Sequence, residues 1–328
     1  MQNAEANLSY YLQLSPLHRI LITSMLQYLR SSEADQTITP RDALRVGSWL
    51  RCEKPSSEEI DKLLALGMDE NIIKDALDPH EVPRVDFEDE WTYLIARLPD
   101  TDDDFNDFTT PILFGIHKNY VVTLSRDSLG RLWQPFVDKT RMNTARRIEL
   151  VVAMIEAVSL QYQRRVATIN RQMRAATDDL HTLRARDIVT LTEYERKLND
   201  YLNALVPMNW AIERLMANRS LRLKEDDKDD VEDISIDLEQ VIARCKSLLR
   251  TITNVRDSYR AVMDTRLNET IRLLTVITVA LTIPTMIAGL YGMNVPVPGA
   301  DDPTMFWKIT AVSVIAAMAT GYYFLRRR

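Results

Sequence analysis

Two uncharged runs of membrane-spanning length lie near the C-terminal end of the chain. The first, Leu273–Leu290, would extend roughly 27 Å as a helix, close to the thickness of a bilayer's hydrocarbon core. The second, Ile309–Leu325, follows Phe306–Lys308, which supplies the aromatic rings and the lysine typical of a membrane interface. We therefore predict a transmembrane hairpin over residues 273–328, with a loop over 291–305. The alternative is a buried helical hairpin in a soluble protein.

The charges that flank these runs predict their orientation. The connecting loop carries Asp301 and Asp302 but no lysine or arginine, whereas Arg326–Arg328 follows the second run and Arg266 and Arg272 precede the first. Because basic residues favour the cytoplasmic side, we expect a multi-pass protein of the cell (inner) membrane, with both termini in the cytoplasm and the loop outside. The three arginines also disfavour the soluble alternative, and we expect them to contact lipid headgroups.

The sequence before the first run favours long helices. No glycine lies between Gly130 and Gly289, and Pro207 is the only proline from residue 136 to residue 283. We expect helices over Thr144–Arg184, over Ile188–Leu223 and from about Val231 into the first membrane run. The chain then divides into an N-terminal cytoplasmic α/β domain (1–135), long helices that include a stalk (136–272) and the hairpin (273–328).

The composition limits the classes of protein that the chain represents. A net charge of −6 argues against nucleic-acid binding. Cys52 and Cys245 fit neither a disulfide framework nor a metal-site spacing. The apolar stretch Ile20–Leu29 lacks the flanks of a signal peptide, and we expect a short amphipathic helix there. No nucleophile–base constellation stands out, so we do not expect an enzyme.

Apolar residues recur at alternating steps of three and four along the third predicted helix. They are Leu238, Val241, Cys245, Leu248, Ile252, Val255, Tyr259 and Val262. This spacing is that of a coiled-coil seam sustained over about three and a half heptads. Two compatible interpretations stay open. The seam packs against other helices of the same chain, or it packs in a symmetric bundle of several copies.

A second stripe follows the same rhythm on another face of this helix. It is acidic at first, then carries amide and hydroxyl groups, and ends at a glycine: Asp257, Ala261, Asp264, Asn268, Ile271, Thr275, Thr278, Thr282, Thr285 and Gly289. Polar residues inside a membrane span face a partner helix or water rather than lipid. The stripe is therefore either a small-residue packing interface or the lining of a cation pore. Because one hairpin cannot enclose water, a pore requires a homo-oligomer.

The stripe leads to Gly292-Met293-Asn294, which follows the first run at the start of the loop. An amide at a pore mouth can accept hydrogen bonds from the water shell of an ion. A ring of neutral amide oxygens would bind a hydrated divalent cation through its water and still release it. No ATP is needed, because a divalent cation gains about 4.6 kcal/mol per 100 mV of inside-negative potential.

With Tyr291 before the tripeptide and a second span after it, the segment Leu281–Asn294 resembles the CorA family of magnesium and cobalt transporters. Ala76–Val85 and the strand-like Trp91–Leu98 resemble the soluble domain of that family, so the similarity runs from about Gly47 to Arg328. The resemblance implies a homopentameric membrane channel. Its fold would be an α+β cytoplasmic domain (an α/β/α sandwich), a long helical stalk and two C-terminal transmembrane helices.

The resemblance also implies roles for individual residues. It implies a selectivity filter at Gly292, Met293 and Asn294. It implies that the first span lines the pore, with the pore-lining positions Asp257, Asn268, Thr275, Thr278, Thr282, Thr285 and Gly289, of which Thr275 and Thr278 are assigned through the shared stripe. It implies a regulatory Mg²⁺ site between subunits at Asp89 and Asp233, with Glu88 and Glu90 as alternatives to Asp89. The family often has a bulkier apolar residue in place of Thr282, which leaves the gating constriction open.

The acidic run Glu225–Glu239 also has two interpretations. It forms a solvated helix end or turn, or it forms a cation-sensing surface. Carboxylates brought together between subunits repel one another unless a cation neutralises them. High cytoplasmic Mg²⁺ would then hold the subunits in a closed state, and low Mg²⁺ would let them separate and open the pore.

The function predicted from the sequence is therefore the import of hydrated Mg²⁺, and of Co²⁺ or Ni²⁺ as further candidates, down the membrane potential. Two alternatives are kept: a zinc transporter of the same superfamily, and a membrane-anchored coiled-coil signalling protein. The Gly-Met-Asn tripeptide favours magnesium or cobalt, and the short loop leaves no room for an external sensing domain.

Overall fold

The computed structural model describes residues 26–31, 37–88, 90–101, 107–129, 132–133, 142–177, 184–218, 225–293, 299 and 304–326. The chain forms two compact units. The first consists of Met1–Asp178 and Arg184–Thr253, and the second of Asp179–Leu183 and Asn254–Arg328. The expected division of the chain at residues 135 and 272 stays a prediction.

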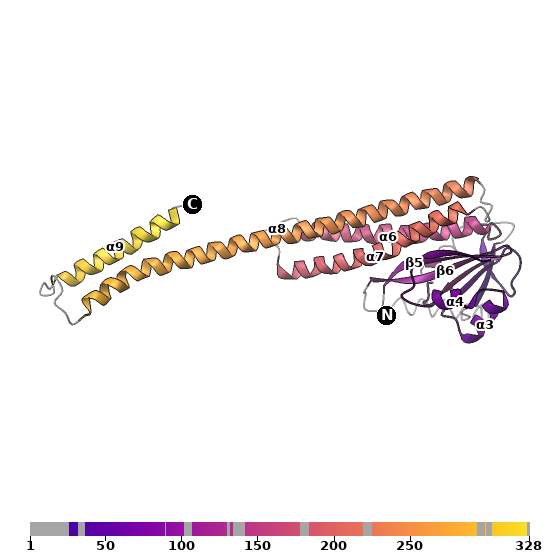
Figure 1. Cartoon of the computed structure of the whole chain (residues 1–328), viewed down its shortest axis with the longest axis horizontal. Coiled ribbons are helices and arrows are strands. Elements are labelled where there is room, and N and C mark those ends of the chain that lie inside the picture. Colours follow the sequence, from indigo (N-terminus) through magenta and orange to yellow (C-terminus); the bar gives the residue numbers. More distant parts are fainter. Residues whose placement is uncertain are drawn as a thin grey trace. The chain divides into compact units, whose positions relative to one another are not determined.

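A mixed sheet lies at the centre of the first unit (Figure 1). Its strands are β1 (Leu26–Ser31), β2 (Ile38–Arg41), β3 (Trp49–Glu53), β4 (Arg84–Glu88), β5 (Trp91–Thr101), β6 (Asp107–His117) and β7 (Val121–Ser125). The described strands follow the order β2-β1-β3-β7-β6-β5-β4, and every neighbouring pair is antiparallel except β3 with β7. The strand expected at Trp91–Leu98 is confirmed as part of β5.

Part of the helix expected at Ile20–Leu29 is a strand instead. Residues 26–29 belong to β1, where Leu26 and Leu29 are buried and Tyr28 pairs with Leu50 of β3. Residues 20–25 lie outside the described residues. Short apolar runs fit both helix and strand periodicity, and here pairing with two neighbouring strands decides between them.

Helices cover both faces of the sheet. On one face, α3 (Ser57–Ala65) and α4 (Glu70–Ala76) bury apolar residues such as Leu63 and Ile73 in a cluster with β3, β5, β6 and β7. On the other, α6 (Arg147–Thr177) and α7 (Ala185–Ala217) lie against β5 and β6. The Tyr162 hydroxyl of α6 donates to the carbonyl of Arg97 at 3.0 Å. The expected α/β/α sandwich is thus confirmed.

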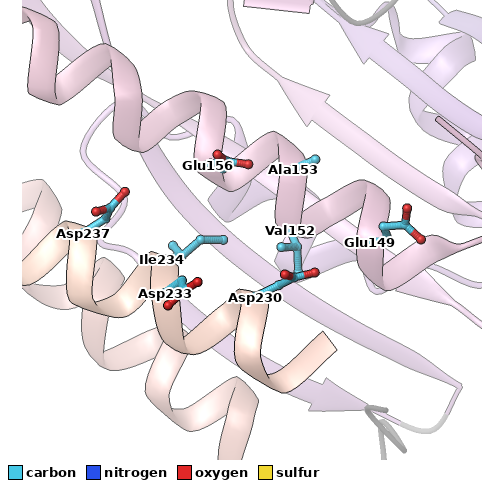
Figure 2. A pocket seen from close by; sticks show the side chains of 8 residues that line it. All are labelled: Glu149, Val152, Ala153, Glu156, Asp230, Asp233, Ile234 and Asp237. Carbon is cyan, nitrogen blue, oxygen red and sulfur yellow. The ribbon is translucent and has the colours of Figure 1, made fainter. Parts of the chain in front are cut away.

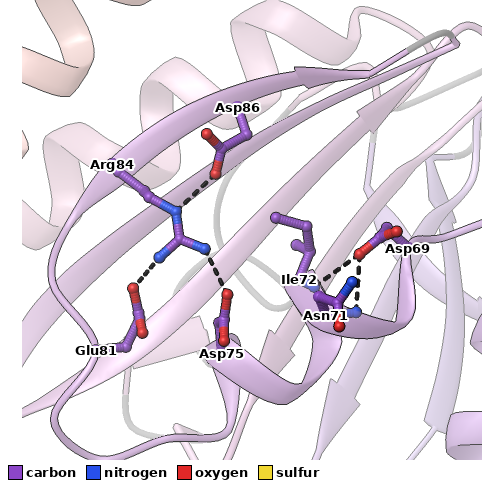
Figure 3. Close-up of polar contacts among 7 residues, drawn as sticks. All are labelled: Asp69, Asn71, Ile72, Asp75, Glu81, Arg84 and Asp86. Carbon is purple, nitrogen blue, oxygen red and sulfur yellow. Dashed lines mark hydrogen bonds and ion pairs between the residues drawn. The ribbon is translucent and has the colours of Figure 1, made fainter.

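Arg84 ties the edge strand β4 to α4 and to the loop between them. Its guanidinium donates to Asp86 at 2.7 Å, to Asp75 at 2.6 Å and to Glu81 (Figure 3). Partial burial lowers the pKa of Arg84, but the hydrogen bonds and charges of Asp86 and Asp75 outweigh that effect and raise it above its usual value. Asp69 caps α4 by accepting from two backbone amides. Charged side chains on an edge strand also discourage pairing with other sheets.

The three long helices are confirmed, with shifted boundaries. The third, α8, runs over Glu225–Tyr291 and therefore begins before the expected Val231. The acidic run Glu225–Glu239 is therefore helical rather than an exposed turn. Pro207 lies inside α7 and Pro284 inside α8 without ending either helix.

The apolar seam of α8 packs inside its own chain as far as Ile252. Leu238, Val241, Cys245, Leu248 and Ile252 are all buried. Two side-chain hydrogen bonds reinforce this packing: Ser235 donates to Asn209 of α7 at 2.9 Å, and Gln163 of α6 donates to Asp237 at 3.3 Å. Beyond this point Val255, Tyr259 and Val262 are half-buried. The first of the two interpretations of the seam is confirmed for its N-terminal part.

The second unit contains the rest of α8 and α9 (Met305–Arg326). Both helices include a window long and apolar enough to span a membrane, with mean hydropathies of 2.1 and 1.2. Only 6% of each window is buried by the described residues. A soluble protein would cover such helices in its own core. The alternative of a buried hairpin is therefore disfavoured.

The seam of α8 yields a stability prediction. Leu238→Ala removes a fully buried side chain and should cost about 2–5 kcal/mol. Ile236→Ala, on the exposed side of the same helix turn, should cost about 0.5 kcal/mol or less. The measurement is pulsed alkylation of Cys245 in denaturant, because burial raises the pKa of this thiol to about 12 and protects it in the folded chain. Equal effects of the two substitutions would contradict the packing described.

Candidate ion path and acidic pocket

The hydroxyl groups of the polar stripe donate hydrogen bonds to backbone carbonyls of the helix that carries them. Thr275, Thr278, Thr282 and Thr285 each bond the carbonyl four residues earlier at 2.8 Å. All four side chains are exposed in the single chain. Because each hydroxyl proton is already engaged, the oxygen offers only lone pairs outward. The stripe therefore presents a column of hydrogen-bond acceptors.

The stripe does not face α9. In the spanning part of α8, the covered positions share one side of the helix: Val276, Ala280, Ile283, Pro284 and Ile287. At 3.6 residues per turn, this side and the side that carries the threonines are about 160° apart. Gly289 agrees, since a Cβ atom added there would meet nothing within 4 Å. The stripe is therefore not a packing interface within the hairpin.

Large apolar side chains border the stripe on both sides. Leu274 and Leu281 lie on one flank and Met286 and Leu290 on the other, and all are exposed. A polar column between two apolar flanks fits a helix whose flanks pack against further copies and whose polar side faces the axis between them. The two interpretations that remain, an interface between copies and a water-filled lining, both require an oligomer.

The predicted filter is only partly described. The helix ends where the amide of Gly292 donates to Ala288 at 3.0 Å and that of Met293 to Leu290 at 3.4 Å. Met293 is exposed. Asn294, on which the filter prediction depends most, lies outside the described residues, as do Asp301 and Asp302. At the start of the stripe, Asp257 and Asn268 are exposed, and Asp257 lies 3.6 Å from Arg260.

An acidic pocket lies between α6 and α8 in the first unit (Figure 2). It has a volume of about 190 Å³ and is lined by eight residues, none of them basic. Five carry carboxylates: Glu149 and Glu156 from α6, and Asp230, Asp233 and Asp237 from α8. In the described part of the chain, no three His, Cys, Asp or Glu side chains are arranged to hold a metal ion directly. The pocket therefore offers negative charge without a preformed cage of ligands.

The other half of the predicted regulatory pair is not described. Asp89 lies outside the described residues; in the sequence it stands between Glu88, which ends β4, and Glu90, which precedes β5. Glu90 is engaged with Lys118 and with His117, whose Nε2 is 3.2 Å away. The bonds to Lys118 and His117 lower the pKa of Glu90. This engagement makes Glu90 a weaker alternative to Asp89, while Glu88 stays an alternative.

The comparison with known proteins gives the family. Residues 46–327 match the family described as CorA-like Mg²⁺ transporter protein. The chain belongs to the CorA family. The resemblance inferred from Leu281–Asn294 is thereby confirmed, and the match begins within a residue of the expected start at Gly47.

Individual CorA proteins resemble the chain over most of its length. The cobalt/magnesium transport protein CorA of Methanocaldococcus jannaschii is 25% identical over 85% of this chain and 90% of its own. The protein of the same description from Thermotoga maritima is 19% identical over 78% of this chain and 75% of its own. The complete structure of the CorA magnesium transporter from M. jannaschii matches with a TM-score of 0.80 at 21% identity, over 93% of this chain and 99% of that one. The fold of the chain is thus the CorA fold.

Sequence reasoning missed the α6 side of the acidic pocket. Glu149 and Glu156 lie more than 70 residues before Asp230, and nothing in their own surroundings indicates an acidic partner. Their one signal is a separation of seven residues, which places both carboxylates on the same side of a helix. Asp233 lies in the pocket, although the expectation paired it only with Asp89.

The placement of the threonines and the covered positions on different sides of α8 predicts a difference in their accessibility. If the stripe is a water-filled lining, cysteine at position 282 should react with a charged, membrane-impermeant thiol reagent in membranes, because water would carry the reagent to it. Cysteine at position 283, on the side toward α9, should not. The measurement is the modification rate of Thr282→Cys and Ile283→Cys in a chain without its two native cysteines. Protection of position 282, or equal rates at the two positions, would contradict a wet stripe.

Proposed function

We propose that this CorA-family chain forms a homo-oligomeric channel that imports hydrated Mg²⁺ down the membrane potential. The observation that carries the proposal is the column of threonine oxygens on the side of α8 that faces away from α9. The membership of the chain in a family of Mg²⁺ transporters supports the choice of ion. The resemblance to CorA proteins supports a pentamer in the cell membrane with both termini in the cytoplasm.

Acceptor-only oxygens suit a hydrated cation. The water molecules around Mg²⁺ bind through their oxygens and direct their protons outward. Threonine oxygens whose protons are already engaged accept those outward protons and offer no competing donor. Mg²⁺ keeps its waters because it dehydrates reluctantly, so contact through the water shell allows faster passage than direct coordination. A neutral lining also avoids the tight binding that carboxylates within the span would cause.

Asn294 is proposed as the selectivity filter at the outer mouth, with Gly292 and Met293 completing the turn. The amide of Gly292 ends α8, and its close approach to Ala288 leaves little room for a side chain, since an added Cβ would lie 3.3 Å from the Ala288 carbonyl oxygen. This close packing restricts the direction in which the backbone leaves α8 at Gly292. Asn268, Thr275 and the remaining stripe residues are proposed to line the path, and Asp257 to attract cations at its cytoplasmic entrance.

Cytoplasmic Mg²⁺ is proposed to regulate the channel through Asp89 and Asp233. The support is the concentration of carboxylates around Asp233 in the acidic pocket. Mg²⁺ typically binds proteins through one or two carboxylates while keeping several waters, so a loose acidic pocket fits this ion better than a site that demands many direct ligands. A bound cation would relieve repulsion among the carboxylates and favour a closed arrangement of the subunits.

Two other functions make different predictions. A zinc transporter of the same superfamily would prefer Zn²⁺ when ions compete in reconstituted vesicles, with and without a proton gradient. A membrane-anchored signalling protein would not carry ions at all. The acceptor column of α8 favours a channel over a signalling anchor, because a simple anchor has no need of aligned hydroxyl groups.

The filter yields a transport prediction. Asn294→Ala should abolish Mg²⁺ uptake into proteoliposomes under an inside-negative potential, because it removes the amide that holds the water shell. Asn203→Ala, which removes an exposed amide from α7, should leave uptake unchanged. Uptake is followed with a Mg²⁺-sensitive dye, and the mass of the detergent-solubilised assembly checks that each variant still oligomerises. Normal uptake by an intact Asn294→Ala assembly would rule out the filter.

The regulatory pair yields a second prediction. Asp89→Lys combined with Asp233→Lys should make the current insensitive to cytoplasmic Mg²⁺, because lysine replaces each proposed cation-binding carboxylate with a positive charge. Glu239→Lys, on an exposed position of α8 outside the pocket, is the matched control and should retain the response. The measurement is current against cytoplasmic Mg²⁺ concentration. An unchanged response in the double variant would refute the regulatory site.

A further inference from the structure

Arg272 of α8 is hydrogen-bonded to the backbone of α9. Its Nη2 donates to the carbonyl oxygen of Phe324 at 2.7 Å. Phe324 is two residues from the end of α9 at Arg326, so its carbonyl is among the last four of that helix, which have no donor within the helix itself. A side chain from one spanning helix thus caps the end of the other. The bond joins residues 52 positions apart, within the second unit.

The position of Arg272 places this bond at the end of the hairpin opposite the loop. Arg272 directly precedes the uncharged run Leu273–Leu290. It lies one turn before Val276, which is 6% exposed and is the one buried residue described in the spanning part of α8. The loop joins the two helices at one end, and the covered positions of α8 continue between the ends. Arg272 joins them at the opposite end.

The chemistry of this contact favours its persistence. A hydrogen bond from a guanidinium is charge-assisted and roughly twice as strong as one between neutral groups. The C-terminal end of a helix also carries partial negative charge, which a cation there stabilises. The guanidinium also has a fixed direction and several donors, so a bond of this kind holds orientation as well as distance.

We propose that Arg272 is a positioning residue that ties the pore-lining part of α8 to α9, so that the two spanning helices move as one body when the channel opens or closes. This role in gating rests on the proposed function. The outer surface of α9 is almost entirely exposed and apolar, with Val312, Ile315 and Met318 each more than 60% exposed, which suits contact with lipid. Because of the Arg272 bond, a movement of α8 at this end also displaces α9 in the surrounding lipid.

The consequence concerns the balance between closed and open states. Helix α8 contains both Asp233 of the acidic pocket and the threonine column, so a change at the pocket can reach the span along a single helix. With the bond in place, displacing α8 also requires displacing α9. Without it, α8 moves alone and opening becomes easier. More cytoplasmic Mg²⁺ would then be needed to hold the channel closed.

The first experiment tests the tie itself and does not depend on transport. Spin labels are placed at the exposed positions 273 and 323 of a full-length chain whose two native cysteines are replaced, in lipid, with one labelled copy per assembly. The distance distribution between the labels should be narrow in the parent and in Arg272→Lys. It should broaden in Arg272→Met. A distribution as narrow in Arg272→Met as in the parent would overturn the proposal, whatever ion the protein carries.

The second experiment tests the effect on gating. Arg272→Met should raise the cytoplasmic Mg²⁺ concentration for half-closure by roughly three- to tenfold, because α8 can then open without displacing α9. Arg272→Lys should restore most of the parent value. Arg250→Met removes the same charge from an exposed position on α8 and should change nothing. An unchanged half-closure concentration in Arg272→Met, or an equal shift in Arg250→Met, would overturn the gating role.

Discussion

A hydroxyl group inside a membrane has to donate a hydrogen bond to an acceptor, and this requirement determines which groups α8 presents to its surroundings. Its threonines meet the requirement by donating to carbonyls of the same helix. The oxygens are then left as acceptors on one side, while the covered apolar positions lie on nearly the opposite side. One side of the helix therefore belongs to its own hairpin, and the other side suits a hydrogen-bond donor. The water around a cation is such a donor, whereas lipid acyl chains are not.

The same helix links this surface to the soluble unit. Its first part is fixed by buried packing against α6 and α7, reinforced by the Ser235–Asn209 hydrogen bond, and it supplies three of the five carboxylates of the acidic pocket. The sheet and its helices hold α6 in place opposite those carboxylates. A change of charge at the pocket therefore acts on a helix that is packed against α6 and α7 in its first part and, in a single chain, exposed in its last part. In the proposed function, the regulatory site lies at the supported end of α8 and the ion path at the exposed end.

The sequence was sufficient for the parts of the fold that depend on periodicity and on charge. Eight glycines confined to the two ends of the chain predicted α6, α7 and α8, and the seam from Leu238 to Ile252 is buried as its spacing required. Local signals failed where tertiary pairing decides the outcome. Leu26–Leu29 fits a helix as well as a strand, and only β2 and β3 make it a strand. The acidic pocket and the Arg272–Phe324 bond join residues far apart in sequence, so no local pattern could indicate them. Asp89 and Asn294 remain sequence-based assignments because both lie outside the described residues.

The most direct test of the account is a structure of the assembled protein in a lipid bilayer, at a resolution that shows ordered water. The account predicts several copies around an axis, with the oxygens of Thr278, Thr282 and Thr285 directed toward a column of water and with α9 on the outside. A structure in which these oxygens face acyl chains, or are packed dry against a neighbouring helix in every state of the channel, would contradict it.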